Sequence, residues 1–159
     1  MKTSPLDAAA LHFSRLGPAG LSPAAPGTCG SALAALLAVW LFLPLPLPYR
    51  IGLLCLLFFV AGPAATRAEM VLGQKDPGSV VSDELIGQWT TYLPFASLSV
   101  YGIAAGFVLF RIFDIAKPWP VRSSEKWLPA GFGVMIDDVI AGLYAMLCLY
   151  GLRLLFPSL

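Results

Sequence analysis

The chain has 159 residues, of which 58% are hydrophobic and only 12% are charged, and its formal net charge is +1. Because a soluble domain carries about 25% charged residues, this composition predicts a membrane protein, and the small net charge gives no electrostatic basis for binding nucleic acid. The single histidine excludes a multi-histidine metal site within one chain, and the three cysteines form no CxxC pair.

Residues 1–20 predict a short helix that lies on the membrane surface or packs over a helical bundle. The next segment, LSPAAPGTCGS at residues 21–31, is rich in proline, glycine and hydroxyl side chains and directly precedes an apolar run. Thr28 or Ser31 would cap the helix that follows. This segment is either a capped loop or an anion site, because its glycines let backbone N–H groups at a helix N-terminus approach a phosphate.

Apolar stretches in the rest of the chain predict an all-α, polytopic membrane bundle in a single domain, residues 1–159. They lie at Ser31–Leu43, Ile51–Thr66, Leu85–Ile115 and Gly131–Phe156. The last is long enough to cross a bilayer, since roughly 26 residues span ~39 Å against a hydrocarbon core of ~30 Å. Depending on whether the third stretch crosses once or twice, we expect about four to five membrane helices.

The third stretch contains Pro94 and is either one kinked crossing or a hairpin that turns near Pro94–Ser97. Carboxylates at its two ends distinguish these alternatives. If Asp83 and Glu84 share a site with Asp114, both ends of the stretch must lie on the same membrane face. We therefore predict a hairpin over residues 85–115.

Basic residues support the same topology. With a hairpin, Arg50 and Arg153 lie on one side of the membrane, and the other basic residues lie on or near the side of the N-terminus. These are Lys2, Arg15, Arg67, Lys75, Arg111, Lys117, Arg122 and Lys126. By the positive-inside rule, the side of the N-terminus is cytoplasmic.

Most of the nine acidic residues lie at the margins of apolar segments, in three patches. The patches contain Asp76, Asp83 and Glu84; Asp114; and Asp137 with Asp138. An aspartate at the centre of a membrane helix costs roughly 2.5–3.5 kcal/mol, so the adjacent pair at 137–138 predicts a positively charged partner. Carboxylates gathered on one face, with lysine and arginine nearby, suit Mg²⁺ and a phosphate ester that is attacked by water.

Other chemistries have less support in the sequence. The chain has no Cys-x5-Arg loop, no histidine pair and no GxSxG nucleophile elbow. A small ion transporter or channel also places carboxylates at membrane depth, but it predicts acids distributed across the bilayer rather than gathered on one face. A scaffold protein without catalysis would tolerate neutral substitutions at all of these acids.

Four segments, in this order along the chain, resemble the phosphatidylglycerophosphatase A family. They are LSPAAPGTCGS at 21–31, KDPGSVVSDELIG at 75–87, FDIAKPWPVR at 113–122 and GFGVMIDDVIAG at 131–142. The resemblance covers about residues 12–150. It implies a Mg²⁺-dependent enzyme of the bacterial inner membrane that removes the terminal phosphate of phosphatidylglycerophosphate to give phosphatidylglycerol. Ala130 stands where the pattern predicts a second glycine, and Pro77 where some members carry a histidine.

Site residues follow from the resemblance together with the charge pattern, and we expect three groups of them. The expected metal ligands are Asp76, Asp83, Glu84 and Asp137; the expected catalytic residues are Asp114, Asp138 and Lys117; and the expected substrate-binding residues are Thr28, Ser31, Lys75 and Arg122. Neighbours on a helix point about 100° apart, so at most one residue of each adjacent acidic pair is expected to contact the metal directly. We favour Glu84 and Asp137 in that role.

Overall fold

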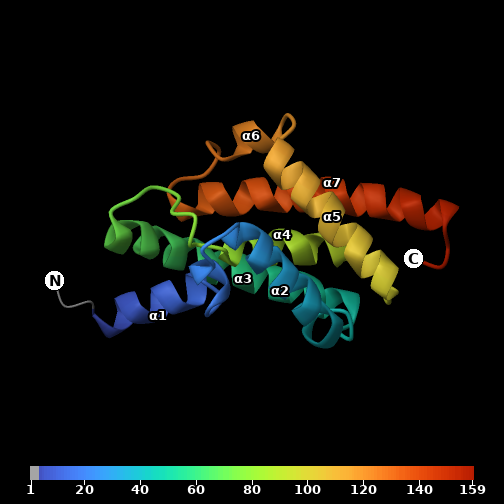
Figure 1. Cartoon of the computed structure of the whole chain (residues 1–159), viewed down its shortest axis with the longest axis horizontal. Helices are drawn as coiled ribbons and strands as arrows, with labels where there is room; N and C mark the ends of the chain where they lie inside the picture. Colours follow the sequence, from blue (N-terminus) through green and yellow to red (C-terminus); the bar gives the residue numbers. More distant parts are fainter. Residues whose placement is uncertain (1–3) are drawn as a thin grey trace.

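A computed structural model describes residues 4–159 and shows an all-α architecture, as the sequence predicts (Figure 1). Lys2, one of the basic residues used to assign the topology, lies outside the described residues. The elements are α1 (Pro5–Ser14), the 3-10 helix η1 (Ala19–Leu21), α2 (Pro26–Leu41), α3 (Leu47–Leu72), α4 (Ser82–Tyr92), α5 (Val100–Ala116), α6 (Val121–Ser124) and α7 (Gly131–Leu155).

Two of the described helices, α3 and α7, are long and apolar enough to cross a membrane, with 26 and 25 residues. The prediction of four to five membrane helices is therefore wrong for the described chain. The physical reason is length and polarity. The 16 residues of α2 extend only ~24 Å, less than a hydrocarbon core of ~30 Å. The 11 residues of α4 are shorter still and include acidic and amide side chains.

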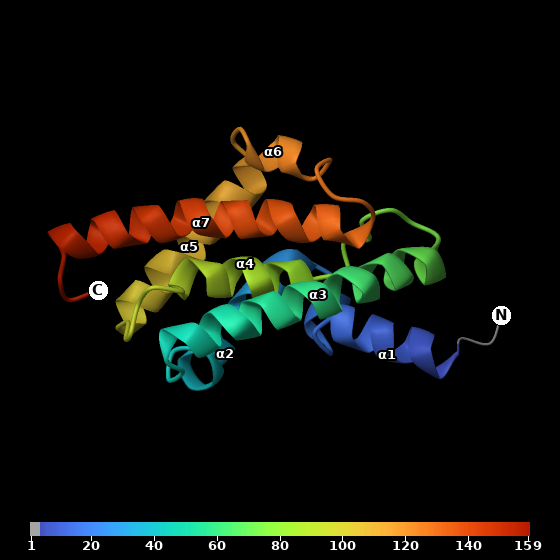
Figure 2. The same ribbon diagram turned by 180° about the vertical axis from the view of Figure 1, so that it is seen from behind.

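The central element of the bundle is α4. All of its residues are buried, and it contacts α2, α3, α5 and α7 (Figures 1 and 2). Asp83 and Glu84 occupy its first turn, where negative charge is favoured by the helix dipole. The surrounding apolar helices thus enclose a polar helix that could not face lipid.

The predicted hairpin over residues 85–115 is confirmed, because the stretch divides into α4 and α5. Ser99 caps α5 by accepting a hydrogen bond from the N–H of Gly102 at 3.2 Å. The Tyr92 hydroxyl donates to the carbonyl of Ile103 at 2.7 Å and joins the two helices near the turn. The start of α4 and the end of α5 consequently lie at the same end of the bundle.

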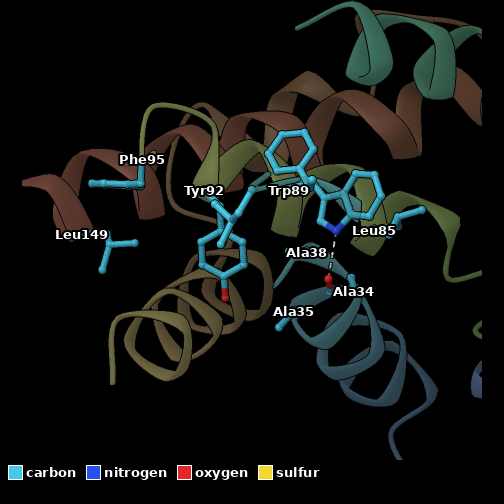
Figure 3. Packing of buried hydrophobic residues seen from close by; sticks show 10 residues of the cluster. Ala34, Ala35, Ala38, Leu85, Trp89, Tyr92, Phe95 and Leu149 are labelled. Atoms are coloured by element: carbon cyan, nitrogen blue, oxygen red, sulfur yellow. Dashed lines mark hydrogen bonds between the residues drawn. The ribbon is translucent and has the colours of Figure 1, made fainter. Parts of the chain in front are cut away.

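Small residues on α2 allow a close approach to α4 (Figure 3). The Trp89 indole N–H donates to the carbonyl of Ala34 at 2.8 Å, and its ring stacks on Phe42 with 4.9 Å between centroids. Ala34 and Ala38 are fully buried under this contact. Because these alanines add almost no width, the N-terminus of α2 lies beside the first turn of α4.

Two contacts hold the remaining elements. The predicted N-terminal helix is present as α1, and an Asp7–Arg67 ion pair of 2.7 Å fixes it against α3. At the opposite end of the bundle, the buried guanidinium of Arg50 donates to the carbonyls of Leu43 at 2.5 Å and Leu93 at 3.2 Å. Arg50 thereby joins the α2–α3 loop to the α4–α5 loop.

Ala130, which precedes α7, has φ of 52° and ψ of −141°, a conformation that favours glycine. We expect Ala130→Gly to relieve strain of about 1–3 kcal/mol, offset partly by the greater freedom of glycine in the unfolded chain. The unfolding temperature in detergent should therefore rise. Ala104→Gly, at an exposed position inside α5, is the matched control and should be destabilising by roughly 0.5–1 kcal/mol. A decrease with Ala130→Gly as large as that of the control would contradict the strain argument.

Candidate active site

Three carboxylates from two helices meet inside the bundle. Asp83 and Glu84 come from the first turn of α4, and Asp138 comes from α7. One oxygen from each lies within 4.8 Å of the other two. The residues are only 6%, 9% and 3% exposed. We name these three residues the acidic cluster.

A cavity of about 230 Å³ opens onto the acidic cluster. Its wall is formed by Pro26, Gly27, Asp76, Gly78, Val80, Asp83, Glu84, Asp114, Lys117, Val134 and Asp138. Of the residues that we expected in the site, Asp76, Asp83, Glu84, Asp114, Lys117 and Asp138 thus lie together. They are brought in from four separate segments, since the hairpin returns α5 to the level of the first turn of α4.

Asp137 and Asp138 point to different partners. Asp138 joins Asp83 and Glu84, whereas Asp137 forms an ion pair with Lys117 and is 1% exposed. The sequence favours Asp137 as the metal ligand of this pair, but the structure places Asp138 with the other two acids. The rotation of about 100° per helical residue separates the two side chains. Lys117 is the positive partner that the adjacent aspartates predict.

Both members of the other acidic pair, Asp83 and Glu84, contribute an oxygen to the acidic cluster. This differs from our expectation that only one residue of each pair would do so. At the first turn of α4 each of the two side chains brings an oxygen within 4.8 Å of an oxygen of Asp138 from α7. The packing of a second helix, not the spacing along the first, decides this arrangement.

Arg111 belongs to the site although it is not among the expected site residues; the sequence predicts only that it can share a helix face with Asp114 and Lys117. Its Nη1 lies 2.5 Å from Asp114, 3.3 Å from the Ser31 hydroxyl and 4.0 Å from Glu84. The side chain is 15% exposed. The only sequence signal was the three-residue spacing from Asp114, which allows a shared helix face but does not predict the contact with Glu84.

Gly27 is a second residue with a role in the site. A Cβ atom at this position would collide with the carboxylate of Glu84. Glycine therefore allows the first turn of α2 to lie directly against the acidic cluster, a requirement that becomes visible only once α2 and α4 are packed.

The expected substrate-binding residues lie outside the wall of the cavity. Ser31 is buried, and its hydroxyl donates to the carbonyl of Gly27 at 2.8 Å. Thr28 lines a separate groove between α2 and α5. Lys75 is 80% exposed, 3.6 Å from Glu125, and Arg122 is exposed on α6. Neither Thr28 nor Ser31 caps α2, because the helix begins earlier, with Pro26 in its favoured first turn.

The acidic cluster contains buried oxygens that have no hydrogen-bond partner among the described residues. They are Asp83 Oδ1, Glu84 Oε2 and Asp138 Oδ2. Buried charged atoms without partners are costly, so such atoms point to a missing cation or proton. Hard divalent cations prefer carboxylate oxygens, and this donor set therefore fits Mg²⁺.

Burial also changes the protonation of the site. It raises the pKa of Asp83 well above its ordinary value, and the adjacent Glu84 carboxylate raises it further. The pKa of Glu84 is raised as well, again chiefly by burial. Burial alone would lower the pKa of Lys117, but the hydrogen bond and charge of Asp137 outweigh it and raise that pKa. Lys117 is therefore a cation at neutral pH.

Acidic residues gather at one end of the bundle, as the enzyme interpretation predicts and the transporter interpretation does not. All nine acids lie within residues 4–159, in α1, the end of α3, the start of α4, the end of α5, the first half of α7 and the adjoining loops. At the opposite end, the described loops at 42–46 and 93–99 carry no acidic residue.

The fold and the cavity together define a helical protein with a buried carboxylate centre at one end, a class of site suited to phosphate esters. The phosphatidylglycerophosphatase A family model matches residues 12–153. The chain is 42% identical to phosphatidylglycerophosphatase A of Escherichia coli K12 over 133 residues, which is 82% of this chain and 76% of that relative. It therefore belongs to the phosphatidylglycerophosphatase A family and is a phosphatase, which confirms the resemblance.

Other relatives broaden the comparison. The phosphatidylglycerophosphatase A of Haemophilus influenzae is 37% identical over 134 residues, 84% of this chain and 82% of the relative. A Bacteroides thetaiotaomicron protein, provisionally named a phosphatidylinositol-3-phosphatase, is 42% identical over 134 residues, 80% of this chain and 83% of the relative. No solved structure matches the chain.

The raised pKa of Asp83 predicts how stability depends on pH when divalent cations are absent. The folded protein holds this proton more tightly than the unfolded chain, whose aspartates titrate at about 3.9. In EDTA, the free energy of unfolding should therefore fall as pH rises from about 4 toward the raised pKa. Asp83→Asn, which stays neutral, should reduce this fall, as measured by thermal unfolding at several pH values.

The matched control for this measurement is Glu125→Gln, since Glu125 pairs with the exposed Lys75 outside the acidic cluster. The control should follow the pH dependence of the wild type. Identical pH dependence in Asp83→Asn and the wild type would show that Asp83 does not carry the buried proton.

Proposed function

We propose that the chain is a Mg²⁺-dependent lipid phosphatase that hydrolyses the terminal phosphate of phosphatidylglycerophosphate to give phosphatidylglycerol in phospholipid biosynthesis. Family membership and the names of the Escherichia coli and Haemophilus influenzae relatives support the substrate. The observation that carries the metal dependence is the convergence of three carboxylate oxygens within 4.8 Å, with buried oxygens that lack partners.

Asp83, Glu84 and Asp138 are the residues proposed to hold Mg²⁺. Asp76 and Asp114 line the same cavity and can accept hydrogen bonds from water molecules around the ion. When bound, Mg²⁺ supplies positive charge that stabilises the phosphoryl group in the transition state and lowers the pKa of nearby water. The three ligands are already oriented by two packed helices, so binding requires little rearrangement of the chain.

Asp114 and Lys117 are proposed to act on the substrate directly. Both lie at the end of α5 and line the cavity. The carboxylate of Asp114 can take a proton from the attacking water, and its ion pair with Arg111 at 2.5 Å fixes its position. Lys117 carries three N–H donors, so it can bind a phosphoryl oxygen while its contact with Asp137 is kept.

The proposed location is the cytoplasmic face of the bacterial inner membrane, with phosphatidylglycerophosphate and membrane lipids as partners. Two apolar helices, α3 and α7, support membrane insertion. The acidic cavity lies at the end of the bundle that also carries Arg67, Lys75 and Lys126, whereas Arg50 lies at the other end. By the positive-inside rule, the basic end with its cavity faces the cytoplasm.

Metal removal and Asp138→Asn test the acidic cluster. Phosphate release from phosphatidylglycerophosphate in detergent should cease in EDTA and return with Mg²⁺. Asp138→Asn should lower kcat about 100-fold, because it removes one charged ligand, while Glu125→Gln, an acid outside the cavity wall, should remain near the wild-type rate. Full activity in EDTA, or an Asp138→Asn rate within threefold of the wild type, would exclude this metal site.

Asp137→Asn separates the role of Asp137 from that of Asp138. Asp137 holds Lys117 rather than joining the acidic cluster, so kcat/KM should fall by about 10–100-fold while the Mg²⁺ concentration for half-activation changes little. The measurement is a Mg²⁺ titration of phosphate release for both variants. Near-normal turnover would remove Asp137 from the site, and a large shift in the Mg²⁺ requirement would make it a ligand.

A further inference from the structure

Two apolar grooves run along the outside of the bundle. One has a volume of about 480 Å³ and lies between α2 and α5; we name it the α2–α5 groove. Its wall includes Thr28, Phe107, Val108, Arg111, Ile112 and Ile115. The other, of about 400 Å³, is lined by residues of α3, α4 and α7 together with Leu93, and none of its lining residues is charged.

Arg111 connects the α2–α5 groove to the acidic cavity. It lines the groove, and its Nη1 contacts Asp114 and Glu84, which line the cavity. Neither groove shares a lining residue with the cavity, but the second groove has no charged lining residue that could pair with the acids of the cavity wall. Of these two grooves, the α2–α5 groove is the one that an ionic contact joins to the site.

The order of groups along this surface is carboxylate cavity, guanidinium, then hydrocarbon wall. Beyond Arg111, the side chains of Val108, Ile112 and Ile115 are 52%, 52% and 70% exposed. Nη1 makes the contacts of Arg111 with the acids, and a guanidinium has five N–H donors, so donors remain for an anion. Arginine is well suited to bind a phosphate through paired hydrogen bonds.

The proposed substrate has the same order of groups. Its terminal phosphate is a monoester, a glycerol joins this to an inner phosphodiester, and the inner phosphodiester carries the diacylglycerol. We propose that the diacylglycerol lies along the α2–α5 groove and that the inner phosphodiester binds Arg111 while the terminal phosphate occupies the acidic cavity. This inference rests on the proposed function and adds a binding mode for the lipid.

The groove is tested by filling it with a large side chain. Ile112→Trp should raise KM for long-chain phosphatidylglycerophosphate about tenfold and change KM for a dibutyryl analogue less than twofold. Leu143→Trp is the matched control, because Leu143 is a partly exposed apolar residue of the second groove. It should leave both KM values near those of the wild type. Thermal unfolding of each variant verifies that the fold is retained.

Two results would overturn the groove assignment. An unchanged long-chain KM in a folded Ile112→Trp would mean that the groove holds only bulk bilayer lipid. An equal rise in Leu143→Trp would mean that the lipid is not bound at one groove. If the wild type releases no phosphate from either substrate, the proposed function itself fails, and this outcome is distinct because it precedes any comparison of variants.

The contact with the inner phosphodiester is tested separately at Arg111. Arg111→Gln should lower kcat, because Arg111 also holds Asp114, and should in addition raise KM for the dibutyryl analogue about tenfold while changing KM for a phosphate monoester without the inner phosphodiester less than twofold. Arg111→Lys should recover part of both losses. A fall in kcat with an unchanged KM for the dibutyryl analogue, or an equal rise in KM for both substrates, would limit Arg111 to holding Glu84 and Asp114 and would overturn this part of the proposal.

Discussion

Asp83, Glu84 and Asp138 bring three carboxylate oxygens within 4.8 Å of one another in a part of the bundle with little access to water. Two ionised groups at that distance repel by on the order of 3 kcal/mol at an effective dielectric constant of about 20. Burial adds a desolvation cost for each charge. A structure that keeps such a cluster needs rigid helices to hold it and cations to compensate it.

Helix packing provides the rigidity. The polar helix α4 lies at the centre, and the small residues Ala34, Ala38 and Gly27 allow α2 to approach it closely. This arrangement explains why the bundle contains fewer long apolar helices than expected. A helix that carries Asp83 and Glu84 inside the protein is surrounded by other helices, so it needs neither the length nor the composition of a membrane span.

Two basic side chains, Lys117 and Arg111, compensate part of the negative charge of the site. Lys117 binds Asp137, whereas Arg111 binds Asp114 and approaches Glu84. Among the described residues, neither forms an ion pair with Asp83 or Asp138. The two basic residues thus hold the outer acids of the site and leave the acidic cluster negatively charged. A divalent cation would neutralise that charge.

The sequence by itself determined the all-α class, the hairpin at 85–115 and the presence of most acids in one site, because apolar runs, Pro94 and charge position are local properties of the chain. Only the tertiary structure decided that α4 is enclosed, that Asp138 rather than Asp137 joins Asp83 and Glu84, and that Arg111 belongs to the site. Those outcomes depend on the rotation of each helix about its axis and on which neighbour it meets. Such contacts join residues that are distant in the chain, and no local pattern specifies them.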